Sequence, residues 1–170
     1  LLKESFERIT ALYEAGLTVQ TTLDATLQAA VNRALDRGLR RLDKRHSLYR
    51  GAIRNVLANG RSIDSFTSDT WAKPIRSGDI VAAVVTAVPT SASAPIRVRI
   101  AGRDAEILPK GFAWGVSPKK PIGTVLKTGD LIEVEVRTVD GNGAFKDLVL
   151  EQAPIIEGAA LAIDNRTGQI

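Results

Sequence analysis

The sequence predicts an α+β fold, in which a small five-stranded β-barrel is inserted between a strand-helix segment and a C-terminal strand. Residues 17–24 alternate apolar and polar side chains, as a half-buried strand does, and run directly into a helical pattern over residues 25–45. Residues 78–150 hold five strand patterns separated by turn signals. Residues 155–163 form a further apolar run, which we expect to lie beside residues 17–24 as a neighbouring strand.

The N-terminal segment predicts two helices flanking the first strand. Residues 1–14 carry apolar side chains at helical spacing, and Gly16 is expected to stop that helix. Asp24 is a good N-cap for the second helix. The second helix has one apolar stripe and several basic residues that lie mostly off it, and the cations near its end favour the helix dipole. The stripe comprises Leu27, Val31, Ala34, Leu35, Gly38, Leu39 and Leu42, and the basic residues are Arg33, Arg37, Arg40, Arg41 and Lys44.

The middle of the chain predicts the barrel. Residues 52–71 show no clear pattern, although residues 53–57 could form one helical turn. Turn residues at Gly102 and over 140–143 indicate hairpins. Five strands within roughly 75 residues predict a small closed or nearly closed barrel of the OB type. The strands are expected over residues 78–88, 96–100, 104–108, 129–139 and 144–150.

Two of these strands begin with the same pair of residues, Gly78-Asp79 and Gly129-Asp130. The pairs could mark an internal repeat. We favour turn chemistry, because glycine and aspartate are both common turn residues for independent physical reasons. The same interpretation applies to residues 164–168, which are expected to turn the C-terminal strand back.

Composition limits the function classes. Of 170 residues, 44% are hydrophobic and 25% charged, so a folded domain is expected. The net charge of +4 is spread along the chain, which permits contact with anionic surfaces without arguing for nucleic acid. The absence of cysteine excludes disulfides and thiolate metal sites, and no apolar run nears the ~20 residues that span a bilayer. The lack of methionine and the end of the chain just after a turn signal predict a piece of a longer protein.

Two groups of residues at the ends of the chain carry a family pattern. Near the N-terminus they are Gly16–Val19, Thr21–Asp24, Leu27–Gln28, Ala34–Leu35, Gly38–Leu39 and Leu42–Arg45. Near the C-terminus they are Leu150–Gln152, Pro154, Gly158–Ala159, Ala162–Asp164, Thr167–Gly168 and Ile170. Together they resemble class A penicillin-binding proteins of the 1A type, which are bifunctional peptidoglycan synthases. Over the middle of the chain the resemblance extends only to the order of elements.

The resemblance implies a domain organisation and a parent activity. In the family, a G-L-x-V-x-T-T-L-D strand precedes the transpeptidase core, and an OB-like domain is inserted before the first hairpin of that core. It implies a linker and pedestal over residues 1–50, an OB-like insert over 51–153 and the start of the core over 154–170. The parent would polymerise a lipid-linked disaccharide-pentapeptide, cross-link stem peptides and bind penicillin. It would work in the periplasm, anchored in the bacterial inner membrane by an N-terminal helix outside this sequence.

Two short stretches match catalytic patterns of that family by letter. Ser117–Lys120 reads S-x-x-K and Lys127–Gly129 reads K-T-G, as in penicilloyl serine enzymes. Pro118 and Gly115 place the serine in a loop, the two stretches are too close together, and no S-x-N triplet lies between them. The family's glycosyltransferase motifs are also missing. We therefore predict no catalytic residue in this chain, and likewise no cofactor and no metal.

The remaining polar candidates favour structural roles. His46 is the only histidine and lies near a predicted helix end, without partners for metal binding or acid-base work. Asp64 and Asp69 show no ligand spacing. Glu133 and Glu135 share one face of a strand, and we interpret them as a solvated face.

The two tryptophans are the remaining candidates for binding. Trp71 and Trp114 are expected to close the ends of the barrel or to pack on a neighbouring domain. The functional alternative is a partner-binding patch formed by Trp114, Lys119 and Lys120, and a glycan-stacking site is a weaker third option.

These observations predict a non-catalytic periplasmic fragment with a docking role. The partner would be a regulatory lipoprotein or another cell-wall synthesis protein, with peptidoglycan and its lipid-linked precursor as ligands of the parent. No nucleic acid is expected, and contact with a membrane is expected only through the anchor of the parent. One alternative is an independent OB-fold protein that binds nucleic acid, and another is a stand-alone serine acyltransferase using Ser117.

Overall fold

The computed structural model describes residues 21–60, 62–91 and 93–168. The chain divides into two compact units, one spanning Asp36–Gly158 and the other combining the two ends of the chain. The helix predicted over residues 1–14 lies outside the described residues, as do residues 17–20 of the predicted first strand. Residues 21–24, at the end of that predicted strand, have no regular secondary structure.

The long helix α2 spans Ala25–His46, one residue more than predicted. Asp24 caps it as expected, because its Oδ1 accepts the backbone N–H groups of Thr26 at 2.8 Å and Leu27 at 3.0 Å. Its last turn is wholly basic, which complements the negative end of the helix dipole. Within the described residues, no helix combines the length and the apolar character that crossing a bilayer requires.

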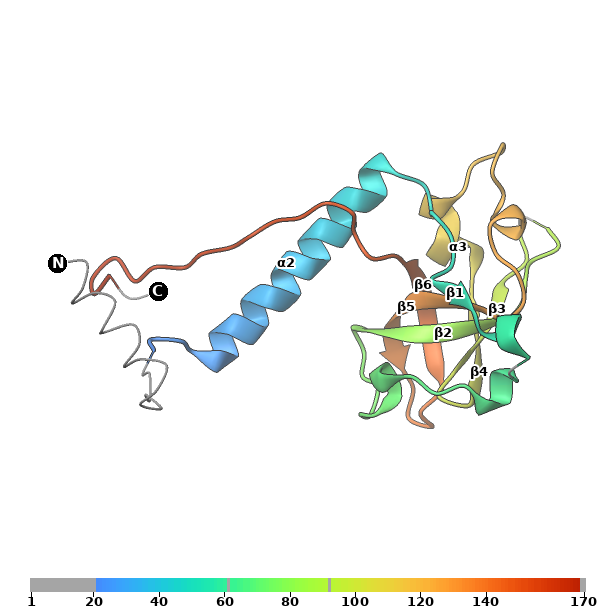
Figure 1. The fold of residues 1–170 in the computed structure, drawn as a ribbon, viewed down its shortest axis with the longest axis horizontal. Coiled ribbons are helices and arrows are strands. Elements are labelled where there is room, and N and C mark those ends of the chain that lie inside the picture. The colour runs from blue at the N-terminus through green and yellow to red at the C-terminus, as the bar shows by residue number, and fades with distance from the viewer. Residues whose placement is uncertain (1–20, 61, 92, 169–170) are drawn as a thin grey trace, which may run out of the picture. The chain divides into compact units, whose positions relative to one another are not determined.

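Six antiparallel strands form one sheet in the unit that spans Asp36–Gly158 (Figure 1). The strands are β1 (Arg54–Asn55), β2 (Asp79–Ala87), β3 (Ile96–Ile100), β4 (Arg103–Ile107), β5 (Asp130–Val139) and β6 (Phe145–Glu151). Strands β2, β3 and β4 form a meander, and β5 and β6 form a hairpin. The two parts join where β2 pairs along one edge of β5, while β1 and β6 share the other edge. The five predicted strands are therefore present.

The sixth strand, β1, was not predicted. It has only two residues, too few to show an alternating pattern, and it leads into a 3-10 turn over Val56–Asn59 instead of the single helical turn that was expected over 53–57. Two further 3-10 turns follow, over Ile63–Ser65 and Asp69–Trp71.

The main core lies on one face of the sheet. On β5, Ile132, Val134 and Val136 are fully buried, while Glu133 and Glu135 alternate with them and lie on the opposite face. Alternate residues of β2, β3 and β6 complete the core together with side chains from the connecting segments. These comprise Val81, Ala83, Val85, Ile96, Val98, Ile100, Leu148, Leu150, Tyr49, Phe112, Ile122 and Leu126.

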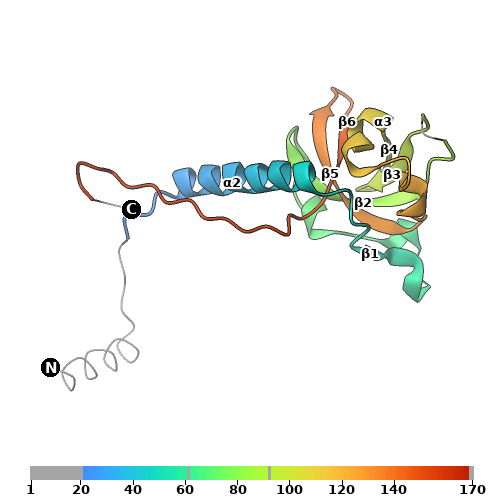
Figure 2. The same ribbon diagram turned by 90° about the horizontal axis from the view of Figure 1, so that it is seen from above.

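A short helix, α3 (Pro109–Phe112), follows β4 and packs on β6 (Figure 2). The close approach requires Gly111, because a Cβ at this position would collide with the carbonyl oxygen of Leu148. Two 3-10 turns, over Ala113–Gly115 and Ile122–Thr124, follow before β5.

The expectation of a closed barrel is wrong, because the sheet is open. Among the described strands β4 pairs only with β3, and β6 pairs only with β5, so no ladder of hydrogen bonds joins the two ends. The chain leaves β4 directly into α3, which lies against β6 near Leu148. A closed barrel would need a registered pair between these strands.

The C-terminal strand predicted over residues 155–163 is also absent, since these residues have no regular strand structure. Ile155, Leu161 and Ile163 are exposed, and none of the described residues pairs with this segment as a strand. A strand needs a neighbouring strand for its backbone hydrogen bonds, and a run of apolar residues does not by itself supply one. The expected pairing of residues 155–163 with residues 17–24 is untested at residues 17–20, which lie outside the described residues.

The interpretation of the Gly-Asp pairs as turns is confirmed. Gly78 and Gly129 both have positive φ, at +90° and +86°. In each turn the aspartate Oδ2 accepts a backbone N–H three residues earlier at 2.7 Å, from Arg76 for Asp79 and from Lys127 for Asp130. The turn predicted over residues 164–168 is present as well.

Candidate anion-binding cleft

The second half of α2 lies against the outer face of the sheet, where β5 and β6 present acidic side chains. The strand register places Glu133 of β5 directly opposite Glu151 of β6. Like charges at directly opposite positions of neighbouring strands destabilise a sheet. This face of the sheet therefore needs cations, and α2 supplies them.

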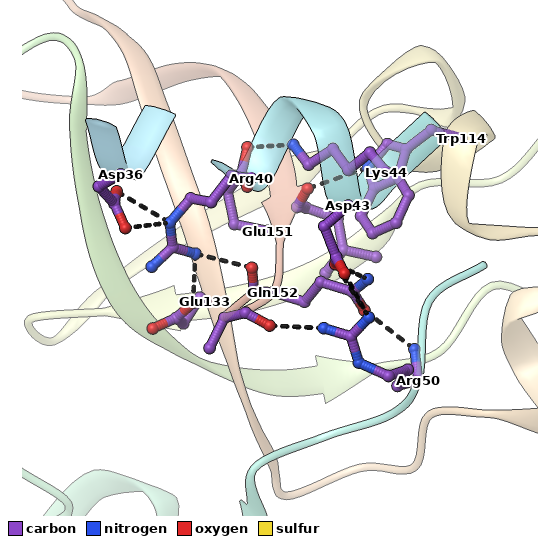
Figure 3. A network of polar contacts seen from close by, with 11 residues as sticks. Asp36, Arg40, Asp43, Lys44, Arg50, Trp114, Glu133, Glu151 and Gln152 are labelled. Atoms are coloured by element: carbon purple, nitrogen blue, oxygen red, sulfur yellow. Dashed lines mark hydrogen bonds and ion pairs between the residues drawn. The ribbon is translucent and has the colours of Figure 1, made fainter. Parts of the chain in front are cut away.

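Arg40 neutralises the first of these carboxylates (Figure 3). Its Nη1 donates to Glu133 Oε2 at 2.6 Å and to the backbone oxygen of Gln152 at 2.9 Å, and its Nε donates to both oxygens of Asp36 at 3.0 and 3.1 Å. Burial alone would lower the pKa of Arg40, but its hydrogen bond and charge interaction with Glu133, and its contacts with Asp36, raise it. The guanidinium is therefore held as a fixed positive charge between helix and sheet.

Lys44 neutralises the second carboxylate. Its Nζ forms an ion pair with Glu151 Oε1 and lies 5.0 Å from the ring centroid of Trp114, a cation-π contact. The Glu151 side chain is only 6% exposed, and its Oε2 is a buried oxygen with no hydrogen-bond partner among the described residues. Burial raises the pKa of Glu151, against the opposing effect of Lys44.

A second set of polar residues, here named the junction network, comprises Asp43, Ser47, Arg50 and Gln152 (Figure 3). Asp43 is 3% exposed. It accepts from Arg50 Nη1 at 2.9 and 3.1 Å and from Gln152 Nε2 at 2.9 Å. Burial alone would raise the pKa of Asp43, but the hydrogen bonds from Arg50 and Gln152 outweigh it and lower the pKa.

Beside these contacts lies a cleft of about 490 Å³, here named the basic cleft. Seven cationic side chains line it against two carboxylates, so its electrostatic potential favours an anion. Its lining residues are Arg37, Arg40, Arg41, Lys44, Arg45, Ile80, Lys110, Trp114, Glu135, Arg137, Val149 and Glu151.

Three of the cations form a row along α2. Arg37, Arg41 and Arg45 are four residues apart, a spacing that places side chains on one helix face. Arg37 makes one long hydrogen bond, at 3.4 Å, to the backbone oxygen of Gly78. Arg41 and Arg45 are exposed and have neither an ion pair nor a hydrogen-bond partner in the part of the chain that the structure describes.

The predicted patch of Trp114, Lys119 and Lys120 is only partly assembled. Trp114 lines the basic cleft, donates from Nε1 to the backbone oxygen of Leu150 at 3.0 Å and packs edge-to-face with Tyr49. Lys120 Nζ donates to the backbone oxygen of Tyr49 at 3.0 Å, whereas Lys119 is exposed. Two of the three residues thus position Tyr49, and their binding of a partner stays a prediction.

The stretches that match catalytic patterns have other roles in the structure. Ser117 and Lys120 form a backbone bridge in a loop, with N–H···O distances of 3.2 and 2.9 Å, and Lys120 Nζ is committed to Tyr49. Lys127–Gly129 forms the turn before β5, as predicted. A serine nucleophile needs a base within hydrogen-bond reach. Lys120, the lysine of the S-x-x-K match, donates to the Tyr49 backbone oxygen instead of serving Ser117.

The other residues that the sequence singled out either lie apart from the basic cleft or take part in the ion pairs beside it. His46 is exposed at the end of α2, Asp64 pairs with Arg99, and Asp69 opens a 3-10 turn. Trp71 covers the outer face of β2, where its Nε1 donates to the Ala82 backbone oxygen at 2.9 Å. Among the described residues, no group of three or more His, Asp or Glu side chains could hold a metal ion.

The interpretation of Glu133 and Glu135 as a solvated face is wrong, because their side chains are only 26% and 25% exposed. Glu133 is bonded to Arg40 where α2 covers the sheet, and Glu135 is paired with Arg137. The sequence shows the spacing of Arg37, Arg41 and Arg45, but the opposition of Glu133 and Glu151 depends on a strand register that has no local signal.

No family model matches the sequence, and no curated protein matches it. The comparison with solved structures supports a fold like that of penicillin-binding proteins. One matching structure is penicillin-binding protein 1A from Haemophilus influenzae, with a TM-score of 0.54 at 18% sequence identity. The alignment covers 89% of this chain and 22% of that protein, so the chain spans about a fifth of its length. At this identity the likeness concerns the fold alone.

Proposed function

We propose that this chain is a non-catalytic docking part of a bifunctional peptidoglycan synthase of the penicillin-binding protein 1A type. The observation that carries the proposal is the likeness in fold to penicillin-binding protein 1A over 89% of the chain. The residue pattern at the two ends of the sequence supports it independently. The parent protein would act in the periplasm from an anchor in the inner membrane.

Within this proposal, residues 51–153 are the OB-like insert between a pedestal segment, 1–50, and the start of the transpeptidase core, 154–170. The strand order supports an OB-type domain, since a three-stranded meander is followed by a helix and a hairpin. The first strand of the meander, β2, pairs with the first strand of the hairpin, β5. The domain is open in this chain, without a registered pair between β4 and β6.

The absence of catalysis has a direct test. Ser117 lies in a loop, and the lysine three residues later donates to the Tyr49 backbone oxygen, which argues against this lysine as the base for the serine hydroxyl. Incubation with a fluorescent penicillin is expected to leave the chain unlabelled, while an active penicillin-binding protein in the same tube is labelled. A stoichiometric acyl adduct on Ser117, located by mass spectrometry, would show a serine acyltransferase instead.

The docking role concerns the patch of Trp114, Lys119 and Lys120. Lys119 is exposed and suits a photo-crosslinking amino acid. In cells that express the chain in the periplasm, we expect this position to capture a regulatory lipoprotein or another cell-wall synthesis protein. The matched control carries the crosslinker at Arg97 on β3, whose side chain is 67% exposed. Equal capture at both positions would argue against a defined docking patch.

A second candidate, an independent nucleic-acid-binding protein, is favoured by one observation, the basic cleft. A gel shift with single-stranded DNA that weakens steeply as salt rises would support it, since counterion release governs such binding. No shift at low ionic strength would exclude it.

A further inference from the structure

We propose that the basic cleft binds an acidic peptide segment of a partner protein, with its carboxylates on Arg41 and Arg45. The inference rests on the proposed docking role, whose partner it describes by chemistry. It concerns a different set of charges from the predicted Lys119 patch, although Trp114 borders both.

The first argument is that the arginine row carries unneutralised charge. Like charges four residues apart on a helix repel one another, and Arg37, Arg41 and Arg45 make two such pairs in succession. On the adjoining side of the same helix, Arg40 and Lys44 each have a carboxylate partner. Within the described residues, acidic partners are therefore present where α2 meets the sheet, but none is present for Arg41 and Arg45. An acidic ligand would remove this repulsion.

The second argument is the spacing of the row. Four residues advance an α-helix by about 6 Å, and alternate side chains of an extended peptide lie about 6.6–6.8 Å apart. Alternate acidic residues of an extended segment can therefore reach successive arginines. Each guanidinium is a planar fork that matches a carboxylate with two parallel hydrogen bonds.

The two carboxylates inside the cleft do not offset this attraction. Glu151 is paired with Lys44, and Glu135 accepts from Arg137 Nε at 3.3 Å. Lys110 is paired with Asp147 at the cleft's edge. The charges left for a ligand are therefore those of the arginine row.

Nucleic acid and glycans fit the cleft less well. Single-stranded nucleic acid and glycans are held in part by stacking on free aromatic faces, and among the described residues Trp114 is the only aromatic residue that lines the cleft. Its ring already contacts Lys44 Nζ at 5.0 Å and Tyr49 at a centroid distance of 6.1 Å. A stacked base or sugar would have to displace these contacts.

A membrane surface also fits less well. Binding to an anionic bilayer combines cations with exposed apolar side chains that enter the headgroup region. Here the apolar lining residues, Ile80 and Val149, are half-buried and buried in the sheet. The cleft thus offers charge without an apolar group to insert.

The test uses the whole chain and a fluorescein-labelled oligoglutamate, read by fluorescence anisotropy at about 0.02 M and about 0.15 M salt. We expect saturable one-to-one binding that weakens with salt. The double variant Arg41→Ser/Arg45→Ser should weaken it by about tenfold or more, since two charge-assisted contacts are lost. The matched control, Arg33→Ser/Arg76→Ser, removes the same charge from exposed residues that do not line the cleft and should bind within about twofold of the unaltered chain.

Several results would overturn the proposal. These are no binding of oligoglutamate at low salt, equal weakening by both double variants, or tighter binding of single-stranded DNA or of anionic phosphatidylglycerol vesicles that depends on Arg41 and Arg45. The thermal midpoint of both double variants should match that of the unaltered chain, because none of the four substituted side chains has an ion pair or a hydrogen bond within the described residues. Photo-crosslinking at Lys119 and penicillin labelling read out the proposed function separately, so either hypothesis can fail alone.

Discussion

Asp43 of the junction network and the arginine row lie on the same turns of α2 but have opposite environments. In the junction network, Asp43 is buried and every charge meets a partner on the chain that follows α2 or on the segment after β6. In the row, Arg41 and Arg45 are exposed and have no partner in the described structure. The contrast indicates a division of roles: one set attaches the helix to the sheet, and the other is left for a ligand.

The difference matters because an arginine that binds a ligand must be held in place by other parts of the fold. A side chain that is fully bonded within the fold contributes to stability but has no capacity for a ligand. A free arginine has that capacity, but its position depends on the helix beneath it. We therefore expect substitutions in the junction network to lower stability, and substitutions in the row to leave it unchanged.

The largest effect is expected for Asp43→Ala. The change leaves the buried Gln152 Nε2 with only a 3.3 Å contact to Ser47 Oγ and removes two hydrogen bonds from Arg50. Because breaking a buried charged contact on one side is costly, the free energy of unfolding should fall by about 2–4 kcal/mol. Urea denaturation measures it. The control is Asp36→Ala, whose carboxylate is 45% exposed and pairs with Arg40 within the helix, and which should cost about 0.5 kcal/mol.

If Asp43→Ala and Asp36→Ala lower the free energy of unfolding equally, the helix has no distinction between a side that attaches it to the fold and a side that faces solvent. The pH dependence provides a second check. The pKa of Asp43 is lowered in the folded state, so its contribution is present above the unfolded pKa and is lost as pH falls through the folded one. Asp43→Ala should therefore lose less stability than the unaltered chain between neutral and acidic pH.

A smaller effect is expected for Arg40→Gln. Glu133 and Glu151 would then face each other across the strands with only Lys44 to offset their charge. We expect a loss of about 1–3 kcal/mol, since the half-buried carboxylate loses a charge-assisted hydrogen bond. The control Arg37→Gln removes an arginine from the same helix whose single hydrogen bond is 3.4 Å long, and it should cost less than about 0.5 kcal/mol. If Arg37→Gln costs as much as Arg40→Gln, the row is structural and the contrast fails.

Local chemistry in this chain was predictable from the sequence. Asp24 caps α2, and the turns at Gly78-Asp79 and Gly129-Asp130 have nearly the same geometry. Each of these signals acts over three or four residues, so it can be recognised from the local sequence without knowledge of the folded structure. The alternation along β5 likewise predicted which of its side chains enter the core.

What the sequence did not reveal depends on contacts between distant segments. The opposition of Glu133 and Glu151 follows from the register of β5 and β6, and the cation that neutralises Glu133 lies 93 residues away in sequence. The open sheet depends on where α3 packs after β4, and the absence of a strand over residues 155–163 depends on the lack of a partner strand among the described residues. Strand pairing and helix packing of this kind depend on tertiary contacts, which the alternation of apolar and polar residues does not encode.

The smallest effect is expected for Glu151→Gln, which tests the border between the attaching contacts and the cleft. Burial raises the pKa of Glu151 above its ordinary value of 4.5, so the folded state holds this proton more tightly than the unfolded chain. Its contribution to stability is therefore full below the ordinary pKa and is lost as pH rises through the pKa of the folded state.

In the Glu151→Gln variant, glutamine keeps an acceptor for Lys44 and does not titrate, so the free energy of unfolding should decline less between pH 4.5 and neutrality than in the unaltered chain. At neutral pH the net change should stay within about 1 kcal/mol, because the loss of the ion pair with Lys44 is offset by the removal of a buried negative charge. Urea titrations at several pH values measure both quantities, and an unchanged pH slope would show that Glu151 is solvated like the arginines beside it.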